Sequence, residues 1–99
     1  MVRTVGLPRM HKEAGERRDF LPEFVAFLDR IGVAEILVEE GYGSGMGLTP
    51  EDYRRASPKL RFGSYQECLA QELVAVVRCP TDDALRQMRR GAILLSMLH

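Results

Sequence analysis

Short apolar runs alternate with helical segments along the whole chain, and this alternation restricts the possible folds more than any other feature. The runs are continuously apolar, and the strongest of them is Val74-Ala75-Val76-Val77. Continuous apolar strands separated by single helices are typical of a parallel sheet whose two faces are covered. Strands are therefore expected at residues 2–7, 36–38, 60–62, 74–77 and 92–98.

Proline, glycine and small polar residues mark the helices between these runs. Pro22 suits the first turn of a helix and Gly32 the position just after its end. Thr49, Ser64 and Thr81 are N-cap residues for three further helices. The pattern predicts an α/β, Rossmann-like fold, with a mostly parallel sheet and helices on both faces, and a flavodoxin-like strand order of 2-1-3-4-5 is the starting assumption. The helices are expected over residues 22–31, 51–56, 65–72 and 82–90.

Composition and charge exclude several classes of function. The 99 residues suit one domain, and 14 basic side chains balance 14 acidic ones, so the basic excess of a nucleic-acid-binding protein is absent. The arginine pairs at residues 54–55 and 89–90 are expected on solvated helix faces. Two cysteines and two histidines at this spacing do not form a zinc-binding set. With neither a signal peptide nor the ~20 apolar residues that cross a bilayer, a cytoplasmic protein is expected.

Four glycines alternate with other residues in the segment Gly41-Tyr42-Gly43-Ser44-Gly45-Met46-Gly47. A dinucleotide-binding fingerprint also places glycines between a strand and a helix, which suggests a phosphate site. In that fingerprint the helix begins directly after the glycines, whereas Leu48-Thr49-Pro50 intervenes here and the helix beyond it is short. We therefore favour a flexible loop or a loop that borders a ligand.

Three residues that carry or can acquire a positive charge follow expected strands. Arg17, with Arg18 beside it, lies in the loop after the first strand, Arg78 ends the fourth strand, and His99 follows the fifth. Small ligands of open α/β sheets bind outside the carboxyl ends of the strands, so these side chains form a candidate anion pocket. Arginine holds a carboxylate through two parallel hydrogen bonds, and imidazole exchanges a proton near neutral pH. Each residue taken singly is also consistent with a solvated surface charge.

Four groups of residues, in this order, carry a resemblance to a known family. They are Val5-Gly6-Leu7-Pro8 through Glu16-Arg17-Arg18 to Leu21-Pro22, the glycine-rich loop with Thr49-Pro50-Glu51-Asp52-Tyr53, Val76-Val77-Arg78-Cys79-Pro80, and residues 94–99. Together they resemble the N-terminal (substrate) domain of the alanine dehydrogenase, transhydrogenase and saccharopine dehydrogenase family. The resemblance spans essentially the whole chain.

The resemblance implies a role for each of the three residues at the strand ends. It implies that Arg17 binds the substrate carboxylate, that Arg78 occupies the position of a family lysine near the carboxylate and the carbonyl, and that His99 is the catalytic histidine. Two residues depart from the family pattern, because Arg78 replaces the lysine and Cys79 replaces a glutamate. Arginine stays charged where a lysine can lose its proton, so the activity need not be that of a strict alanine dehydrogenase.

The resemblance further implies that residues 1–99 are a single N-terminal substrate-domain segment, with an incomplete sheet, of an NAD- or NADP-dependent amino-acid oxidoreductase. Its reaction would be the reversible reductive amination of a 2-oxo acid. The nicotinamide would bind to a Rossmann domain outside this chain, so the segment alone is expected to be inactive. The expected partners are a 2-oxo acid or amino acid and further copies of the chain in a homo-oligomer.

Two other functions remain open at this point. An opine- or saccharopine-type reductase would condense a 2-oxo acid with an amino acid, and the segment from His11-Lys12-Glu13 to Glu16-Arg17-Arg18 resembles such enzymes. A transhydrogenase-like module would bind or assemble without catalysing a reaction.

Overall fold

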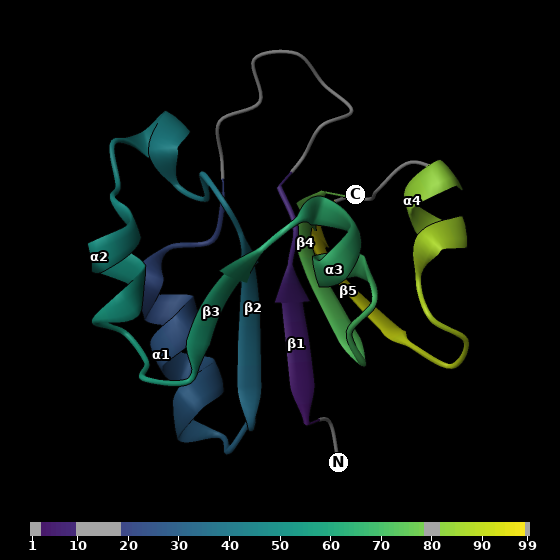
Figure 1. Ribbon diagram of the computed structural model, residues 1–99, viewed down its shortest axis with the longest axis horizontal. Helices are drawn as coiled ribbons and strands as arrows, with labels where there is room; N and C mark the ends of the chain where they lie inside the picture. The colour runs from purple at the N-terminus through teal and green to yellow at the C-terminus, as the bar shows by residue number, and fades with distance from the viewer. Residues whose placement is uncertain (1–2, 10–18, 79–81, 99) are drawn as a thin grey trace.

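A computed structural model describes the backbone of residues 3–9, 19–78 and 82–98, and the side chains of these residues except 78, 82–84, 97 and 98. In this part of the chain strands and helices alternate as predicted (Figure 1). The strands are β1 (Thr4–Leu7), β2 (Glu35–Glu39), β3 (Leu60–Gly63), β4 (Leu73–Arg78) and β5 (Ile93–Leu98). The helices are α1 (Pro22–Arg30), α2 (Pro50–Arg54), α3 (Tyr65–Leu69) and α4 (Asp82–Gln87), with a 3-10 turn η1 (Ser44–Met46).

The five strands form one parallel sheet in the order β3-β2-β1-β4-β5. The predicted α/β, Rossmann-like fold is confirmed. The flavodoxin-like strand order is wrong, because β1 lies between β2 and β4 and not between β2 and β3. The residues of the strands explain the order: β3 carries the exposed Arg61 and suits an edge, whereas β4 has the buried residues Val74 and Val76 and suits a place between two strands.

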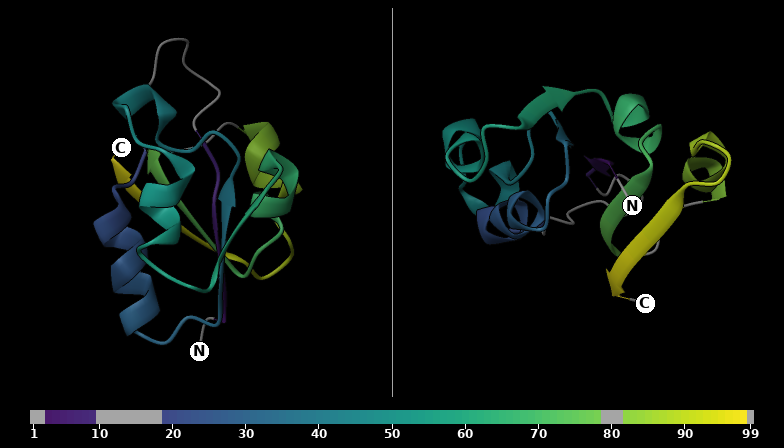
Figure 2. Two further views of the ribbon diagram at one scale, coloured as in Figure 1. Left: turned by 60° about the vertical axis from the view of Figure 1, so that its left-hand side comes forward. Right: turned by 90° about the horizontal axis from the view of Figure 1, so that it is seen from below.

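Two helices lie on each face of the sheet, α1 and α2 on one and α3 and α4 on the other (Figure 2). Crossovers in parallel sheets are right-handed, so connections that step in the same direction lie on the same face. Here the first two connections step toward β3 and the last two toward β5. The larger core, on the face of α1 and α2, contains Val5, Leu7, Val25, Leu28, Val33, Ile36, Val38, Tyr42, Tyr53 and Ala75, and the smaller core contains Leu69, Val74 and Val76.

Local signals set the end of α1 and the starts of α2 and α3 as predicted. Gly32 follows α1 with a φ of 94°, and its N–H donates to Asp29 O, as in a Schellman turn. Thr49 and Ser64 each begin a helix with a capping box, in which the side chain accepts the N–H of the third helical residue. Thr81, the predicted cap of α4, lies outside the described residues.

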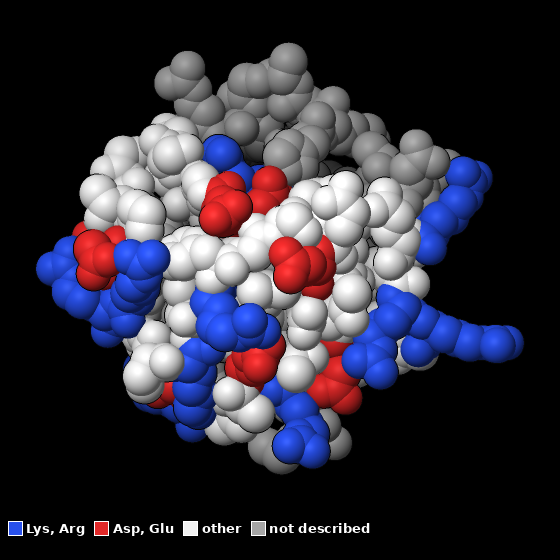
Figure 3. Space-filling model, viewed as in Figure 1, with Lys and Arg blue, Asp and Glu red and all other residues white. Residues whose placement is uncertain are grey.

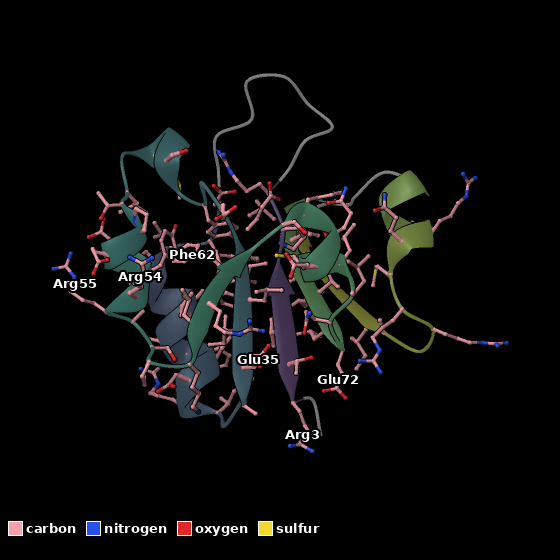
Figure 4. All side chains as sticks on the ribbon, viewed as in Figure 1. Arg3, Glu35, Arg54, Arg55, Phe62 and Glu72 are labelled. Carbon is pink, nitrogen blue, oxygen red and sulfur yellow. The ribbon has the colours of Figure 1, made fainter. Side chains whose placement is uncertain are left out.

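All four helices end before the predicted residue, α1 and α2 by one or two residues and α3 and α4 by three. α3 ends at Leu69, before the predicted residue 72, and α4 ends at Gln87, before the predicted residue 90. Glu72 binds the start of β1 instead of extending α3: its Oε1 accepts the N–H groups of Arg3 at 2.9 Å and of Thr4 at 3.1 Å (Figure 4). These two hydrogen bonds, between residues far apart in the sequence, align β4 with β1. They also compete with a continuation of α3 to Glu72.

The backbones of β1 and α3 are in close contact at Gly6. A Cβ atom at this residue would lie 1.9 Å from the carbonyl oxygen of Cys68, so only glycine fits. The Cys68 side chain is fully buried, and burial raises the pKa of its thiol to about 12. The thiol therefore remains protonated at neutral pH and acts as a small apolar group.

β5 forms an edge of the sheet and is only partly covered. Leu94 packs into the smaller core, so the side chains of Ile93 and Leu95 point to the opposite face, where they are 53% and 38% exposed. The covering of the sheet is thus incomplete at β5 in the described part of the chain. No helix among the described residues is long and apolar enough to span a membrane.

Candidate functional site

The carboxyl ends of all five strands lie at one edge of the sheet, the upper edge in Figure 1. At this edge Arg78, the last residue of β4, pairs in register with Leu98, the last residue of β5. The loop that leaves β1 begins at the same edge, and so does the glycine-rich loop that follows β2. This edge is therefore the candidate functional site.

Of the three predicted site residues, one falls within the described backbone. Arg78 ends β4 at the candidate edge, as its position in the sequence indicated. Arg17 and His99 lie outside the described residues. Their neighbours in the chain are described: Leu98 precedes His99 at the end of β5, and Asp19 follows Arg17 by two residues.

A charged cluster joins the start and the end of the loop between β1 and α1. The backbone N–H of Arg9 donates to Glu39 Oε1 at 2.8 Å, which ties the loop to the end of β2. The guanidinium Nε of Arg9 lies 3.4 Å from Oδ2 of Asp19. The Asp19 side chain is only 4% exposed, whereas that of Arg9 is 25% exposed. Arg9 and Asp19 thus form a partly buried ion pair at the edge of the sheet where the strands end.

Asp19 and the residue after it also bind the glycine-rich loop and α2. Oδ2 of Asp19 accepts the N–H of Gly43 at 2.7 Å. The N–H of Phe20 donates to the hydroxyl of Tyr42 at 3.0 Å, and the hydroxyl of Tyr53 donates to the carbonyl of Phe20 at 2.7 Å. The two tyrosine rings pack edge to face with their centroids 5.3 Å apart. Residues 19 and 20 are therefore fixed by side chains and backbone from two later segments.

Replacement of Tyr53 by phenylalanine is expected to lower the free energy of unfolding by about 1–1.5 kcal/mol. The ring and its packing remain, but the carbonyl of Phe20 loses its 2.7 Å hydrogen bond inside the protein. Urea unfolding of the complete natural polypeptide that contains these residues measures the effect. Equal stability of Tyr53→Phe and wild type would show that this hydrogen bond makes no net contribution.

Burial raises the pKa of the Asp19 carboxyl above its ordinary value of 3.8, although the hydrogen bond from Gly43 and the charge of Arg9 both lower it. Just above pH 3.8 the folded protein therefore holds more protons at Asp19 than the unfolded chain does. The contribution of Asp19 to the free energy of unfolding therefore falls as the pH rises through that range.

Replacement of Asp19 by asparagine removes this titration, and it leaves an oxygen that accepts the N–H of Gly43. We expect the stability of Asp19→Asn relative to wild type to increase as the pH rises from about 3 to about 7. Urea unfolding of both proteins across this range measures the difference. A difference that is constant with pH would contradict a raised pKa of Asp19.

The glycine-rich loop is closed on itself and does not present a phosphate cradle. Gly41, Gly43 and Gly47 have φ values of 88°, 78° and 78°. A Cβ at Gly43 would lie 2.5 Å from the ring of Tyr53, so this glycine allows the loop to pack on α2. The geometry thus agrees with the sequence argument against a phosphate site in this loop. In the glycine-rich loop and the residue after it, the backbone N–H groups donate to acceptors within the protein; the donor residues are Tyr42, Gly43, Ser44, Met46, Gly47 and Leu48.

Sequence reasoning missed Arg9, Asp19, Tyr42 and Tyr53 as residues of this edge. Asp19 follows two arginines, so the sequence predicts one more solvated surface charge. No local pattern links Asp19 to Gly43, which lies 24 residues later. One signal was available: the tyrosine in the glycine-rich loop, Tyr42, is an unusual residue for a flexible segment. Tyr42 is indeed buried, and its ring packs against that of Tyr53.

The arginine pair of α2 lies away from this edge and is neutralised locally. Arg54 contacts Glu51 and lies 5.1 Å from the centroid of the Phe62 ring (Figure 4). Arg55 forms an ion pair with Asp52 at 2.8 Å and is 73% exposed. Acidic and basic side chains lie next to each other over much of the face seen in Figure 3. The expectation of a solvated helix face is confirmed for this pair.

Comparison with known proteins shows which family shares this sequence. Residues 6–99 match the family described as "Alanine dehydrogenase/PNT, N-terminal domain". Alanine dehydrogenases from Mycobacterium tuberculosis and Mycolicibacterium smegmatis are 32% and 30% identical to the chain over 95 residues. These residues are 96% of this chain and 25% of each relative, so the chain spans about a quarter of the length of these curated relatives.

Two solved structures share the fold. A structure of L-alanine dehydrogenase has a TM-score of 0.82 at 26% identity, over 97% of this chain and 26% of the other. The transhydrogenase from Sinorhizobium meliloti has a TM-score of 0.81 at 23% identity, over 94% of this chain and 27% of the other. The second similarity, because of its low identity, supports the fold alone.

Proposed function

The chain belongs to the alanine dehydrogenase/PNT N-terminal domain family, and from that premise we propose that it is the substrate-binding part of an amino-acid oxidoreductase. In this proposal the domain holds a 2-oxo acid, or the corresponding amino acid, at the carboxyl edge of its sheet. The reaction is reversible reductive amination. The observation that carries the proposal is the register that aligns Arg78 with Leu98 at this edge, beside the loops that follow β1 and β2.

Three residues have separate roles in the proposed reaction. Arg17 binds the carboxylate of the substrate through two parallel hydrogen bonds, a geometry that the guanidinium group favours. Arg78 polarises the carbonyl or the imine, and its permanent charge stabilises the negative charge that develops on the carbonyl oxygen when ammonia adds. His99 exchanges the proton with that oxygen or nitrogen, because the pKa of imidazole lies near neutrality.

The glycine-rich loop does not fit the pyrophosphate of a dinucleotide. The glycine-rich loop uses the backbone N–H groups of Tyr42, Gly43 and Ser44 for hydrogen bonds within the protein, so they are not available to phosphate oxygens. A nicotinamide cofactor, NAD or NADP, belongs to the proposed reaction and would be bound by residues outside this chain. The proposal for residues 1–99 is therefore limited to binding the acid, orienting it and moving the proton.

The direct test is a steady-state assay of the complete natural polypeptide with a nicotinamide cofactor. We expect amino-acid-dependent reduction of the cofactor, and the reverse reaction with pyruvate and ammonium. Replacement of ammonium by an amino acid separates the proposed reaction from that of an opine- or saccharopine-type reductase. Absence of turnover together with absence of pyruvate binding in calorimetry would refute the proposal and favour a non-catalytic module.

A further inference from the structure

We propose that an amphipathic helix from elsewhere in the same natural polypeptide packs beside α1, on the side of β4 and β5 that the described residues leave uncovered. We call this place the open helix position. The inference goes beyond the proposed function and does not depend on it, because it concerns the covering of the sheet and not the ligand at its carboxyl edge.

The two faces of the sheet are covered to different extents at β4 and β5. On one face α4 connects these two strands, and Met88 just after it packs against the smaller core. On the other face α1 connects β1 to β2 and α2 connects β2 to β3, so both helices lie over the half of the sheet that β1, β2 and β3 form (Figures 1 and 2). Helices pack about 8–10 Å apart and strands about 4.8 Å apart, so a helix beside α1 lies about two strands away, over β4 and β5.

β5 presents apolar side chains to the open helix position. Ile93 and Leu95 pair in register with Leu73 and Ala75 of β4, which pack in the larger core, so all four side chains point to the face of α1 and α2. Ala75 is buried, whereas Ile93 is 53% and Leu95 38% exposed. β5 carries no charged residue. Because parallel sheets have both faces covered, these exposed side chains indicate that a layer is missing over β4 and β5 in the described part of the chain.

α1 presents apolar side chains to the same place. Pro22 and Ala26 line a shallow groove that α1 shares with α2, and Val25 is fully buried against the sheet. At 3.6 residues per turn, Phe27 and Ile31 lie on the remaining side of α1, which faces away from α2 and toward β4 and β5. They are 44% and 49% exposed. Exposed apolar residues of α1 and of β5 therefore flank the open helix position.

The size of this surface favours a helix of the same polypeptide over a second copy of the chain. Full burial removes about 60–120 Å² of an aliphatic side chain from water, and no more than about 250 Å² of an aromatic one. The four residues are already about half covered, so they offer far less than the ~800 Å² that each partner contributes to a standard interface. A tethered helix needs less area, because its connection to the chain offsets most of the loss of translational freedom. The curated relatives, of which this chain spans about a quarter, are long enough to supply such a helix.

Cysteine accessibility in the folded, complete natural polypeptide tests whether the open helix position is filled. We expect Leu95→Cys to react with a maleimide at least about 10-fold more slowly than Leu85→Cys. Leu85 is the matched control, because it lies in α4 on the other face and is 40% exposed, against 38% for Leu95. The wild-type protein gives the background rate of the native cysteines. Equal rates for the two variants would overturn the inference.

Replacement of Phe27 by p-benzoylphenylalanine identifies what fills the position. Irradiation is expected to link this side chain to a peptide of the same chain outside residues 1–99, so the product keeps the monomer mass on a denaturing gel. Mass spectrometry is expected to identify a segment with apolar residues at spacings of three and four. A product of twice the monomer mass would assign the surface to a second copy and overturn the inference, and so would links confined to residues 1–99. Neither readout needs turnover, so failure of the proposed function leaves both tests valid.

Discussion

Replacement of Arg17 by alanine in the complete natural polypeptide is expected to weaken binding of a 2-oxo acid by about 2–5 kcal/mol. The expected loss is that of truncating one partner of a desolvated charge pair, because in the proposed contact the guanidinium binds the substrate carboxylate and its removal leaves that carboxylate without a partner. Calorimetric titration with pyruvate measures the affinity directly. The KM for pyruvate gives an independent value from the steady-state assay.

The neighbouring arginine supplies the control for this experiment. Arg18→Ala removes the same charge one residue away, and it is expected to leave pyruvate binding largely unchanged. Equal losses in the two variants would indicate that the loop attracts the anion only through its total charge. Unchanged binding in Arg17→Ala would remove the residue from the site.

Replacement of Gly6 by alanine is expected to destabilise the domain by about 3 kcal/mol or more, at or above the upper end of the usual cost of overpacking. The added Cβ would lie 1.9 Å from Cys68 O and 2.7 Å from the carbonyl carbon of the same residue. These are backbone atoms, so a change of side-chain rotamer cannot relieve the clash. β1 and α3 must separate, and urea unfolding or the yield of soluble protein will show the loss.

Gly47→Ala is the matched control, since it tests an added methyl group without a clash. Gly47 has a φ of 78°, and a Cβ added there would meet no distant part of the described chain within 4 Å. The expected cost is therefore only that of the left-handed backbone, about 1 kcal/mol. If Gly6→Ala lowered the free energy of unfolding no more than Gly47→Ala does, β1 and α3 could move apart at little cost, and the prediction would be wrong.

Much of the fold was predictable because its signals are local. Pro22 and Gly32 mark the ends of α1, and Thr49 and Ser64 begin α2 and α3 with capping boxes, as their sequence patterns indicate. Such signals act within one helical turn and do not depend on the rest of the chain. The ends of α3 and α4 were less well predicted, and at α3 the competing contact is the one between Glu72 and the start of β1.

The candidate site was predictable only in part. Since the carboxyl ends of parallel strands meet at one edge, the position of Arg78 followed from the strand pattern alone. The partners of Asp19 did not follow from it, because neither Arg9 nor Gly43 is within one turn of that residue. The contact with Gly43, which lies in the loop after β2, depends on β1 and β2 being neighbours in the sheet.

The amino-acid sequence by itself determined the class of fold, the order of strands and helices along the chain, and the place of Arg78 at the end of its strand. These depend on hydrophobic periodicity and on capping residues, which act over a few positions. Only the tertiary structure decided the strand order and the burial of Asp19 between Arg9 and Gly43. Both of these arise from contacts between distant segments, whose energies depend on which strands lie side by side.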